Sequence, residues 1–576
     1  MPTKWIINEL TPEQKLCKEN LKRQTPLSPT LCELLAKRGI CDPNAVKEFF
    51  HPSKEQILDP YLFNDMDKAV ARLDTAMRNN EKVLVFGDYD VDGTTAVALV
   101  YKFLTGINFT NIDFYIPDRY DEGYGVSYKG IDYAVAGGFT LMIVLDCGIK
   151  AVEKVKYAKE HGVDIIICDH HTPDAVLPDA VAVLDAKRED STYPYPHLSG
   201  CGVGFKFMQA VAQSNGIAEA QLYELLDLLA ISIASDIVPI TGENRALMAL
   251  GLKRLNTHPC IGLQAILQTC DMSGRNDITT SDIVFKIGPR INASGRMSSG
   301  REAVELLISK DMADASEKSS QIDDYNQKRK DLDKSTTEQA KALIERDKER
   351  HDKMKCTVVF DPNWSKGVIG IVASRLSETF FRPTVVMTRS NGFATGSARS
   401  VSGFDIYKAI DSCRDLLENF GGHMFAAGLT LKEENIPAFI ERFDQYIQEN
   451  MVEEQADRQI EVDAEIKFDE ITPTFFNHLQ AFAPFGPDNM KPVFVTRNVV
   501  NAGGCRRVGK SHEHLKLELL DPATGASMDG IAFGMGEEFY DHLHAGKPVS
   551  VCYTVEENNF NGRKTLQMMV KDLKKE

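Results

Sequence analysis

The stretch VLVFGDYDVDGTTA, residues 83–96, decides the fold of this chain and the chemistry of its site. Its first five residues have the pattern of a buried strand, and the segment TTAVALVYKFL that follows the aspartates has helical periodicity. Between them, Asp88, Asp90 and Asp92 stand within five positions. Carboxylates this close repel one another unless a cation lies among them. The stretch therefore predicts a strand–turn–helix unit with a cation at the turn.

The alternation of strand and helix continues to residue 187. The predicted strands are KVLVFG, NIDFYIPD, LMIVLDCG, DIIICDHH and AVAVLDAK. Near-continuous apolar strands that alternate with helices are typical of a parallel sheet covered on both faces. We therefore expect an α/β fold, in which ligands bind outside the carboxyl ends of the strands.

Length and composition limit the class of protein. A chain of 576 residues predicts two to four domains. A net charge of −17, from 66 basic and 83 acidic residues, argues against a basic surface throughout but allows local basic grooves. Twelve cysteines without a C-x-x-C pair favour neither a thiolate zinc site nor a disulfide framework. Without a signal-like N-terminus or a spanning apolar run, we expect a soluble cytoplasmic protein with no membrane partner.

We expect four segments along the chain. Residues 1–310 hold N-terminal helices and the catalytic domain, 311–353 a connecting helix, 354–455 a second α/β domain, and 456–576 a β-rich domain. The charged run 324–353 is either a nucleic-acid clamp or a solvated linking helix, and its mixed charges favour the helix. The strand-like stretches PVSVCYTVEE and RKTLQMMVKDL, separated by Asn561-Gly562, predict a hairpin.

Acidic residues follow four consecutive predicted strands. After the first come the three aspartates above, and after the others come Asp118, Asp146 and Asp169, the last continuing into His170 and His171. Any one of them alone is typical of a helix N-cap or a turn. Together they converge on one edge of the sheet. Asp236, which follows the apolar segment LLDLLAISIAS, is either an exposed loop acid or a further member of this group.

Carboxylates and imidazole without thiolate favour Mn²⁺ or Mg²⁺ over Zn²⁺. Four or five acids and a histidine exceed the needs of one such ion, so we expect two. Two neighbouring metal ions activate water and bind the oxygens of a phosphate. These residues therefore indicate a phosphoester or phosphoanhydride hydrolase.

Longer motifs carry a resemblance to a known family. GDYDVDG and the DHH at 169–171 resemble the DHH phosphoesterase superfamily. Within it, six further motifs resemble the RecJ family of single-strand-specific 5′→3′ exonucleases: SGCGVGFKF (199–207), SDIVP (235–239), IGPRINASGRM (287–297), GVIGIVASR (367–375), GSARSVSGFDIY (396–407) and FGGHMFAAG (420–428). The resemblance implies a DHH domain, a long connecting helix, a DHH-associated domain and a C-terminal oligonucleotide-binding (OB) fold. It also implies release of 5′ mononucleotides from single-stranded DNA in recombination and repair.

The resemblance assigns roles to individual positions. The implied metal ligands are Asp88, Asp90, Asp92, Asp146, His170 and Asp236, with Asp146 bridging two Mn²⁺ or Mg²⁺ ions. His171 would be catalytic, in contact with the scissile phosphate. The implied substrate-binding residues are Arg119, Arg290, Asn292, Arg296, Ser397, Arg399, Gly422 and His423. The motifs GSARS and FGGH would also suit ordinary tight turns.

The β-rich region offers weaker signals for nucleic-acid binding. Residues 497–519 contain Arg506, Arg507, Lys510 and Lys516, which suit a phosphate backbone or a basic hairpin that faces solvent. Phe533 and Phe560 suit base stacking or the core. Two departures from the family motifs are Ser365-Lys366, where a histidine is usual before GVIGIVASR, and PFGPDNMKP at 484–492.

Two other functions remain open. One is a DHH hydrolase of short oligoribonucleotides, cyclic dinucleotides or polyphosphate, against which the β-rich domain argues. The other is a metal-free binding protein, against which the intact acids and DHH argue. As partners, the family implies single-stranded DNA, a helicase and a single-strand DNA-binding protein, and we expect a monomer.

Overall fold

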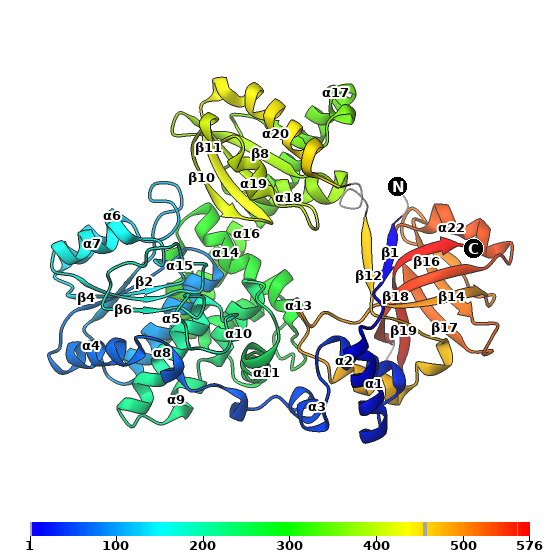
Figure 1. Cartoon of the computed structure of the whole chain (residues 1–576), viewed down its shortest axis with the longest axis horizontal. Helices are drawn as coiled ribbons and strands as arrows, with labels where there is room; N and C mark the ends of the chain where they lie inside the picture. Colours follow the sequence, from blue (N-terminus) through cyan, green and yellow to red (C-terminus); the bar gives the residue numbers. More distant parts are fainter. Residues whose placement is uncertain (1–2, 453–457, 561–562) are drawn as a thin grey trace. The chain divides into compact units, whose positions relative to one another are not determined.

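The computed structural model describes residues 3–452, 458–560 and 563–576, which fold into two compact units (Figure 1). Unit 1 comprises Asp59–Asp236 and Gly251–Arg458, and unit 2 comprises Thr3–Leu58, Ile237–Leu250 and Gln459–Glu576. Helix α11 (Gly242–Thr257) contributes residues to both. The N-terminal helices thus cluster with the C-terminal region, whereas the sequence led us to group them with the catalytic domain.

A five-stranded parallel sheet forms the first domain of unit 1 and confirms the predicted α/β fold. Its order is β3-β2-β4-β5-β6, with β2 Val83–Gly87, β3 Ile112–Tyr115, β4 Leu141–Leu145, β5 Asp164–Cys168 and β6 Ala182–Leu184. Every residue of β2 and β4 is buried, because helices cover both faces. In Figure 1, α6 (Tyr128–Gly137) and α7 (Val152–Glu160) lie on one face, and α4 (Met66–Arg78), α5 (Val91–Gly106) and α8 (Gly200–Ser214) lie on the other.

Helices complete this domain and link it to the next. They are α9 (Glu219–Tyr223), α10 (Leu226–Ser235), α12 (Ile261–Thr269), α13 (Thr280–Asp282), the π-helical η3 (Ile283–Ile287), α14 (Gly288–Met297), α15 (Gly300–Leu307), α16 (Met312–Arg346) and α17 (Lys348–Lys353). Helix α16 has 35 residues and is the predicted connecting helix. Helix α16 is not only a solvated linker, because one of its residues is bonded to the second domain. The carboxylate of Asp333, only 1% exposed, accepts hydrogen bonds from Arg375.

The second domain of unit 1 contains a mixed sheet in the order β10-β11-β9-β8-β7. Its strands are β7 Thr357–Phe360, β8 Thr384–Ser390, β9 Phe393–Arg399, β10 Leu417–His423 and β11 Ala426–Leu431, with helices α18 (Ile369–Phe380), α19 (Ile406–Asp411) and α20 (Ile436–Asn450). GSAR lies within β9 and FGGH within β10, so the alternative interpretation of these motifs as ordinary tight turns does not hold. Their small residues pair instead, with Ser397 opposite Gly428 and Gly421 opposite the same glycine.

Unit 2 is built on a closed β-barrel, which confirms the predicted OB fold. Its strands are β13 Ala464–Glu465, β14 Phe494–Asn501, β15 Arg506–Val508, β16 His514–Leu520, β17 Ser527–Ala532, β18 Val549–Phe560 and β19 Arg563–Lys575. The barrel closes because β14 pairs with both β18 and β16. The predicted hairpin is β18–β19, whereas its turn at Asn561-Gly562 lies outside the described residues. Helices α21 (Pro473–Gln480) and α22 (Gly536–His544) share one buried hydrophobic cluster with the strands of the barrel.

The N-terminal segment belongs to unit 2 because it shares a strand pairing and a core with the barrel region. Strand β1 (Lys4–Ile7) pairs in parallel with β12 (Gln459–Val462). After it come α1 (Pro12–Gln24), α2 (Pro29–Lys37) and α3 (Pro43–Phe50). Leu31 and Leu35 of α2 are buried in one cluster with Phe475 and Phe494. These contacts join residues more than 400 positions apart, which local sequence patterns do not encode.

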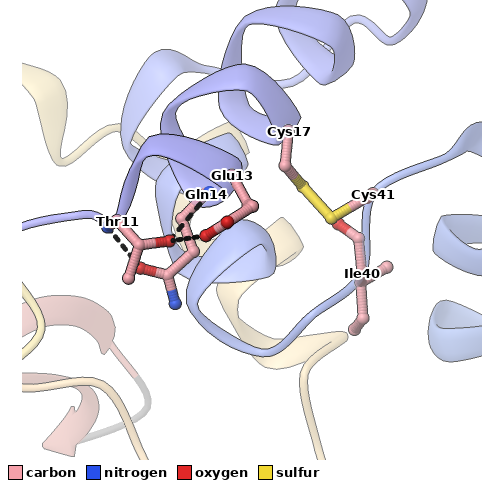
Figure 2. Close-up of a disulfide and its surroundings, with 6 residues drawn as sticks. All are labelled: Thr11, Glu13, Gln14, Cys17, Ile40 and Cys41. Atoms are coloured by element: carbon pink, nitrogen blue, oxygen red, sulfur yellow. Dashed lines mark hydrogen bonds between the residues drawn. A yellow bond between two sulfur atoms is a disulfide. The ribbon is translucent and has the colours of Figure 1, made fainter.

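A disulfide joins Cys17 of α1 to Cys41, with the two Cα atoms 4.9 Å apart (Figure 2). The ten remaining cysteines are free. The sequence analysis did not predict this disulfide, because the spacing of 24 residues matches no motif. In the part of the chain that the structure describes, no helix is both long and apolar enough to cross a bilayer.

Candidate metal centre and substrate cavity

The DYDVDG segment folds into a tight turn between β2 and α5. Asp90 is the N-cap of α5, and its carboxylate accepts a hydrogen bond of 3.1 Å from the backbone N–H of Gly93. A Cβ atom at Gly93 would lie 2.4 Å from the carbonyl oxygen of Asp88, so the turn requires glycine there. This close return places Asp88, Asp90 and Asp92 at the same end of the sheet.

His170 lies at the centre of the acidic cluster. Its Nε2 atom is 3.2 Å from Asp146, 3.6 Å from Asp236 and 3.8 Å from Asp92, measured to a carboxylate oxygen in each case. Two sets of three ligand atoms each lie within 4.8 Å of one another: Asp92, His170 and Asp236, and Asp146, His170 and His171. Strand ends and helix termini thus bring together residues that are up to 144 positions apart, from Asp92 to Asp236.

The electrostatics of this cluster fit a cation. Burial and neighbouring carboxylates raise the pKa values of Asp88, Asp146 and Asp236 well above their ordinary range. Burial lowers the pKa of His170 to about 4, which keeps its imidazole neutral and able to donate a lone pair. Both ring nitrogens of His170, one oxygen of Asp88 and one of Asp236 are buried without a hydrogen-bond partner. Such atoms cost free energy when unpaired, and a divalent ion would satisfy them.

Asp169, the first residue of the DHH motif, orients His171. Its carboxylate accepts hydrogen bonds from the backbone N–H groups of Ile149 and His170 and lies 2.7 Å from Nδ1 of His171. Burial opposes its charge, but these bonds and His171 outweigh burial and lower the pKa to about 2. Burial likewise disfavours a charged His171, yet the bond to Asp169 raises the pKa of that imidazole.

Asp118 takes no part in the cluster. One of its carboxylate oxygens accepts hydrogen bonds of 2.8 Å from the backbone N–H groups of Tyr120 and Asp121. It is therefore a turn residue, and the expectation that all four strand ends contribute acids to one site was wrong for this strand. The physical reason is that β3 ends at Tyr115, three residues before the acid, so the chain has already turned away.

The glycines of SGCGVG hold two of the acids in place. The backbone N–H groups of Gly200 and Cys201, at the N-terminus of α8, donate to Asp92 at 2.6 and 2.8 Å, and the Ser232 hydroxyl donates at 2.7 Å. A Cβ atom on Gly200 would lie 2.5 Å from Cβ of Asp146. The sequence motif by itself was weak, and we assigned it no role. Its only signal was a serine N-cap followed by glycines.

A cavity of about 470 Å³ lies between the two domains of unit 1. Four cationic side chains line it: Arg119, Arg296, Lys366 and Arg399. No acidic residue is among its described lining residues. Burial and the neighbouring charges of Arg119, Arg329 and Arg399 lower the pKa of Arg296 to about 10, and the opposing charge of Asp90 does not offset them. The cavity is therefore complementary to an anion.

The predicted substrate residues divide into three groups. Arg119, Arg296, Ser397 and Arg399 line the cavity. Gly422 and His423 end strand β10, and burial together with the charges of Arg399 and His171 lowers the pKa of His423, which places this imidazole near both. Arg290 and Asn292 do not line the cavity. The guanidinium of Arg290 instead forms a 2.7 Å ion pair with Asp323 of α16, so its nearest anion belongs to the connecting helix.

Comparisons with known proteins agree with this architecture. Three family models match: the DHH family N-terminal domain over residues 82–233, the DHHA1 domain over 353–449 and the RecJ OB domain over 462–572. The single-stranded-DNA-specific exonuclease RecJ of Bacillus subtilis is 35% identical, over 99% of this chain and 70% of its own length. RecJ of Escherichia coli is 30% identical, over 95% of this chain and 96% of its own length. The chain belongs to the RecJ family.

A solved structure of the RecJ family shares the whole fold. The crystal structure of RecJ from Thermus thermophilus in complex with Mn²⁺ superposes with a TM-score of 0.83, at 26% identity, and covers 100% of this chain and 80% of that one. A second structure of that protein, in complex with Mg²⁺, has a TM-score of 0.78 at 25% identity. Both carry divalent ions of the kind that the acidic cluster fits.

Tyr124 is a residue of this RecJ-family site that sequence reasoning missed. It lines the cavity, and its hydroxyl donates a 3.0 Å hydrogen bond to the backbone carbonyl of Asp146 and lies 3.1 Å from Nε2 of His171. The cavity and the acidic cluster thus meet at this side chain. A tyrosine within RYDEGYG carries no local mark of such a position.

In unit 2 the basic residues predicted for nucleic-acid binding take different positions. Arg506 of β15 pairs with Lys516 of β16, so these two side chains share one face. Arg507 lies over the ring of Tyr540 at 4.7 Å. Phe533 is 55% exposed and contacts the ring of His514. Roles for these residues and for Lys510 stay predictions, and the side chain of Phe560 lies outside the described part.

Proposed function

We propose that this chain hydrolyses single-stranded DNA from its 5′ end, releasing 5′ mononucleotides, with two divalent ions, Mn²⁺ or Mg²⁺, in recombination and repair. The observation that carries the proposal is that the cationic cavity and the acidic cluster meet at Tyr124. A strand whose terminal phosphate enters the cavity would present its next phosphodiester to the acids. The names of the relatives, single-stranded-DNA-specific exonucleases, support the substrate class.

The residues of the cluster would share the binding of the ions. Asp88, Asp90, Asp92, Asp146, His170 and Asp236 supply the oxygen and imidazole ligands that such ions prefer. Bound there, the ions would polarise the phosphodiester and activate water. The backbone N–H groups of α8 keep Asp92 oriented, and Asp169 keeps His171 oriented.

His171 would act on the leaving 3′ oxygen, either by orienting it or by giving it a proton. We expect His171→Ala to lower kcat by about 10²- to 10³-fold, the usual range for loss of a general acid, with little change in Mn²⁺ affinity. Steady-state kinetics with calorimetric titration of Mn²⁺ would measure both. His170→Ala is the matched control, because it should weaken Mn²⁺ binding as well. Equal losses of metal affinity in the two variants would contradict the assignment.

Arg399 would grip the end of the strand. Its guanidinium is held within β9 by hydrogen bonds to the Ser397 hydroxyl at 3.0 Å and the Ala398 carbonyl at 2.7 Å. We expect Arg399→Ala to raise KM for 5′-phosphorylated DNA about tenfold or more, the scale of one charge-assisted hydrogen bond, and to leave Mn²⁺ binding intact. Arg290→Ala is the matched control outside the cavity. Unchanged kinetics on 5′-phosphorylated DNA would refute this role.

Unit 2 would bind the strand beyond the active site. Basic strands bind the phosphate backbone, and an exposed aromatic ring such as that of Phe533 stacks on a base. We also propose that the chain acts as a monomer in the cytoplasm, on strands that a helicase exposes and a single-strand DNA-binding protein covers. Family membership alone supports these partners.

The proposed function is tested by following mononucleotide release from single strands labelled at the 5′ end or internally, with duplex DNA and a short RNA alongside. Reactions contain Mn²⁺, Mg²⁺ or chelator. Early, metal-dependent loss of the 5′ label from single strands, and not from duplex, is the expected result. If only the short RNA is consumed, the chain is a hydrolase of small substrates, and the proposal fails.

A further inference from the structure

Lys366 differs from the three arginines that line the cavity. It lies in the loop between β7 and α18, half-buried, with Nζ 6.0 Å from the ring centroid of Tyr120. Among the described residues, no hydrogen bond or ion pair engages its ammonium group. Burial and the charge of Arg119 lower its pKa, and the carboxylate of Asp118 offsets this only in part. An anion bound in the cavity would therefore stabilise the charged form of this ammonium group.

The arginines, in contrast, are held by the protein. Arg119 stacks over Tyr89 at 4.0 Å, and Arg296 donates a 2.9 Å hydrogen bond to the Gly367 carbonyl. Arg399 is bound within β9 as described above. Guanidinium groups held in this way give a fixed geometry, whereas a lysine is a mobile point charge on a flexible stem. Among the cations that line the cavity, Lys366 is therefore the one best able to adjust its position to anions of different charge.

The loop that carries Lys366 is fixed against the cavity wall. A Cβ atom at Gly367 would lie 2.8 Å from both the Arg296 carbonyl oxygen and the Tyr120 hydroxyl. Helix α18 begins two residues later, without a side-chain cap, and its first two residues, Ile369 and Gly370, line the cavity. Free N–H groups at a helix N-terminus favour anions. Lysine and helix terminus therefore face the same ligand.

The 5′ end of a DNA strand can carry different charges, depending on its terminal group, whereas every internal phosphodiester carries the same charge. An internal phosphodiester carries one negative charge, whereas a terminal phosphomonoester approaches two at neutral pH, with a second pKa of about 6. A 5′-hydroxyl end carries no terminal phosphate. A mobile cation in a cavity without acidic lining residues would distinguish these ends most strongly.

We propose that Lys366 is a specificity-determining residue, through which the chain prefers a 5′-terminal phosphomonoester to a 5′-hydroxyl. This inference rests on the proposed exonuclease function. Lys366 stands in the segment Ser365-Lys366, where the sequence departs from the family motif.

The test compares kcat/KM for removal of the first nucleotide from matched single strands with 5′-phosphate or 5′-hydroxyl ends, in Mn²⁺. Only the first cut is scored, because each cleavage leaves a 5′-phosphate on the remaining strand. We expect Lys366→Ala to lower the phosphate-to-hydroxyl preference about 10- to 100-fold, the scale of one charged hydrogen bond. Lys366→Arg should restore most of it, and melting temperatures should match.

Lys102→Ala is the control, because this half-buried lysine of unit 1 lines a different cavity. Its preference should equal that of the native chain. A native chain without end preference, or equal losses on both ends in Lys366→Ala, would overturn the inference while leaving the exonuclease intact. If the native chain degrades neither strand, the proposed function itself fails.

Discussion

Replacement of Asp146 by asparagine should lower kcat on single-stranded DNA by about 10³-fold, the upper end of the loss caused by removing one group that stabilises transition-state charge. The same change should raise the melting temperature of the metal-free chain by a few degrees. Asp146 is 3% exposed and lies among Asp92, Asp90 and Asp236, which repel its charged form. The neutral amide removes this repulsion, but it is a poor ligand for a divalent ion.

Scanning calorimetry with chelator and with Mn²⁺ would measure the stability effect, and initial rates would measure the activity. Mn²⁺ should stabilise the native chain, since a ligand that binds only the folded state raises the melting temperature, and should stabilise the variant much less. Asp118→Asn is the matched control, because that strand-end acid lies outside the cluster and asparagine preserves its turn. Lower stability of metal-free Asp146→Asn would contradict the repulsion on which the metal centre is argued.

Gly200→Ala should lower activity about 10²-fold and weaken Mn²⁺ binding to a similar degree, the range seen when residues that support metal ligands are changed. The added methyl group would overlap Cβ of Asp146 at 2.5 Å and its Cα at 2.7 Å. Relief of that overlap would move either Asp146 or the start of α8, whose N–H groups hold Asp92. A single methyl group would thus disturb two acids that the variant does not replace.

Gly202→Ala is a close control in the same turn of the helix. A Cβ atom there would meet its nearest neighbour, Leu198, at 3.3 Å, which small shifts can accommodate. We expect Gly202→Ala to keep near-native activity and metal affinity. Rates measured across a Mn²⁺ titration would separate weaker binding from slower chemistry. Near-native activity and metal affinity in both alanine variants would show that helix α8 tolerates displacement and does not position the acids.

Sequence patterns alone predicted the parallel sheet and the acidic cluster. Apolar strands that alternate with helices leave few folds open, because both faces of the sheet must be covered. Carboxylates that follow such strands meet at one edge, so Asp88, Asp92, Asp146 and His170 could be assigned to that edge without coordinates. Assignment of the cavity residues Arg119, Arg296 and Arg399 depended on family resemblance, since no local pattern separates them from surface arginines.

Local sequence did not determine the partners of side chains. Asp118 and Asp146 both follow predicted strands, yet only backbone geometry shows that one closes a turn and the other faces His170. Arg290 and Arg296 stand in one motif, and only the packing of α14 sends the first to α16 and the second to the cavity.

The sequence by itself determined the strands and helices of the parallel-sheet domain, and that a cation must lie among the acids, because periodicity and like-charge repulsion act over a few residues. Tertiary structure alone decided that Gly200 holds Asp92 and Asp146, that Tyr124 joins cavity and cluster, and that the N-terminal helices belong with the barrel. Those outcomes depend on contacts between distant segments, whose distances and hydrogen bonds exist only once the chain has folded.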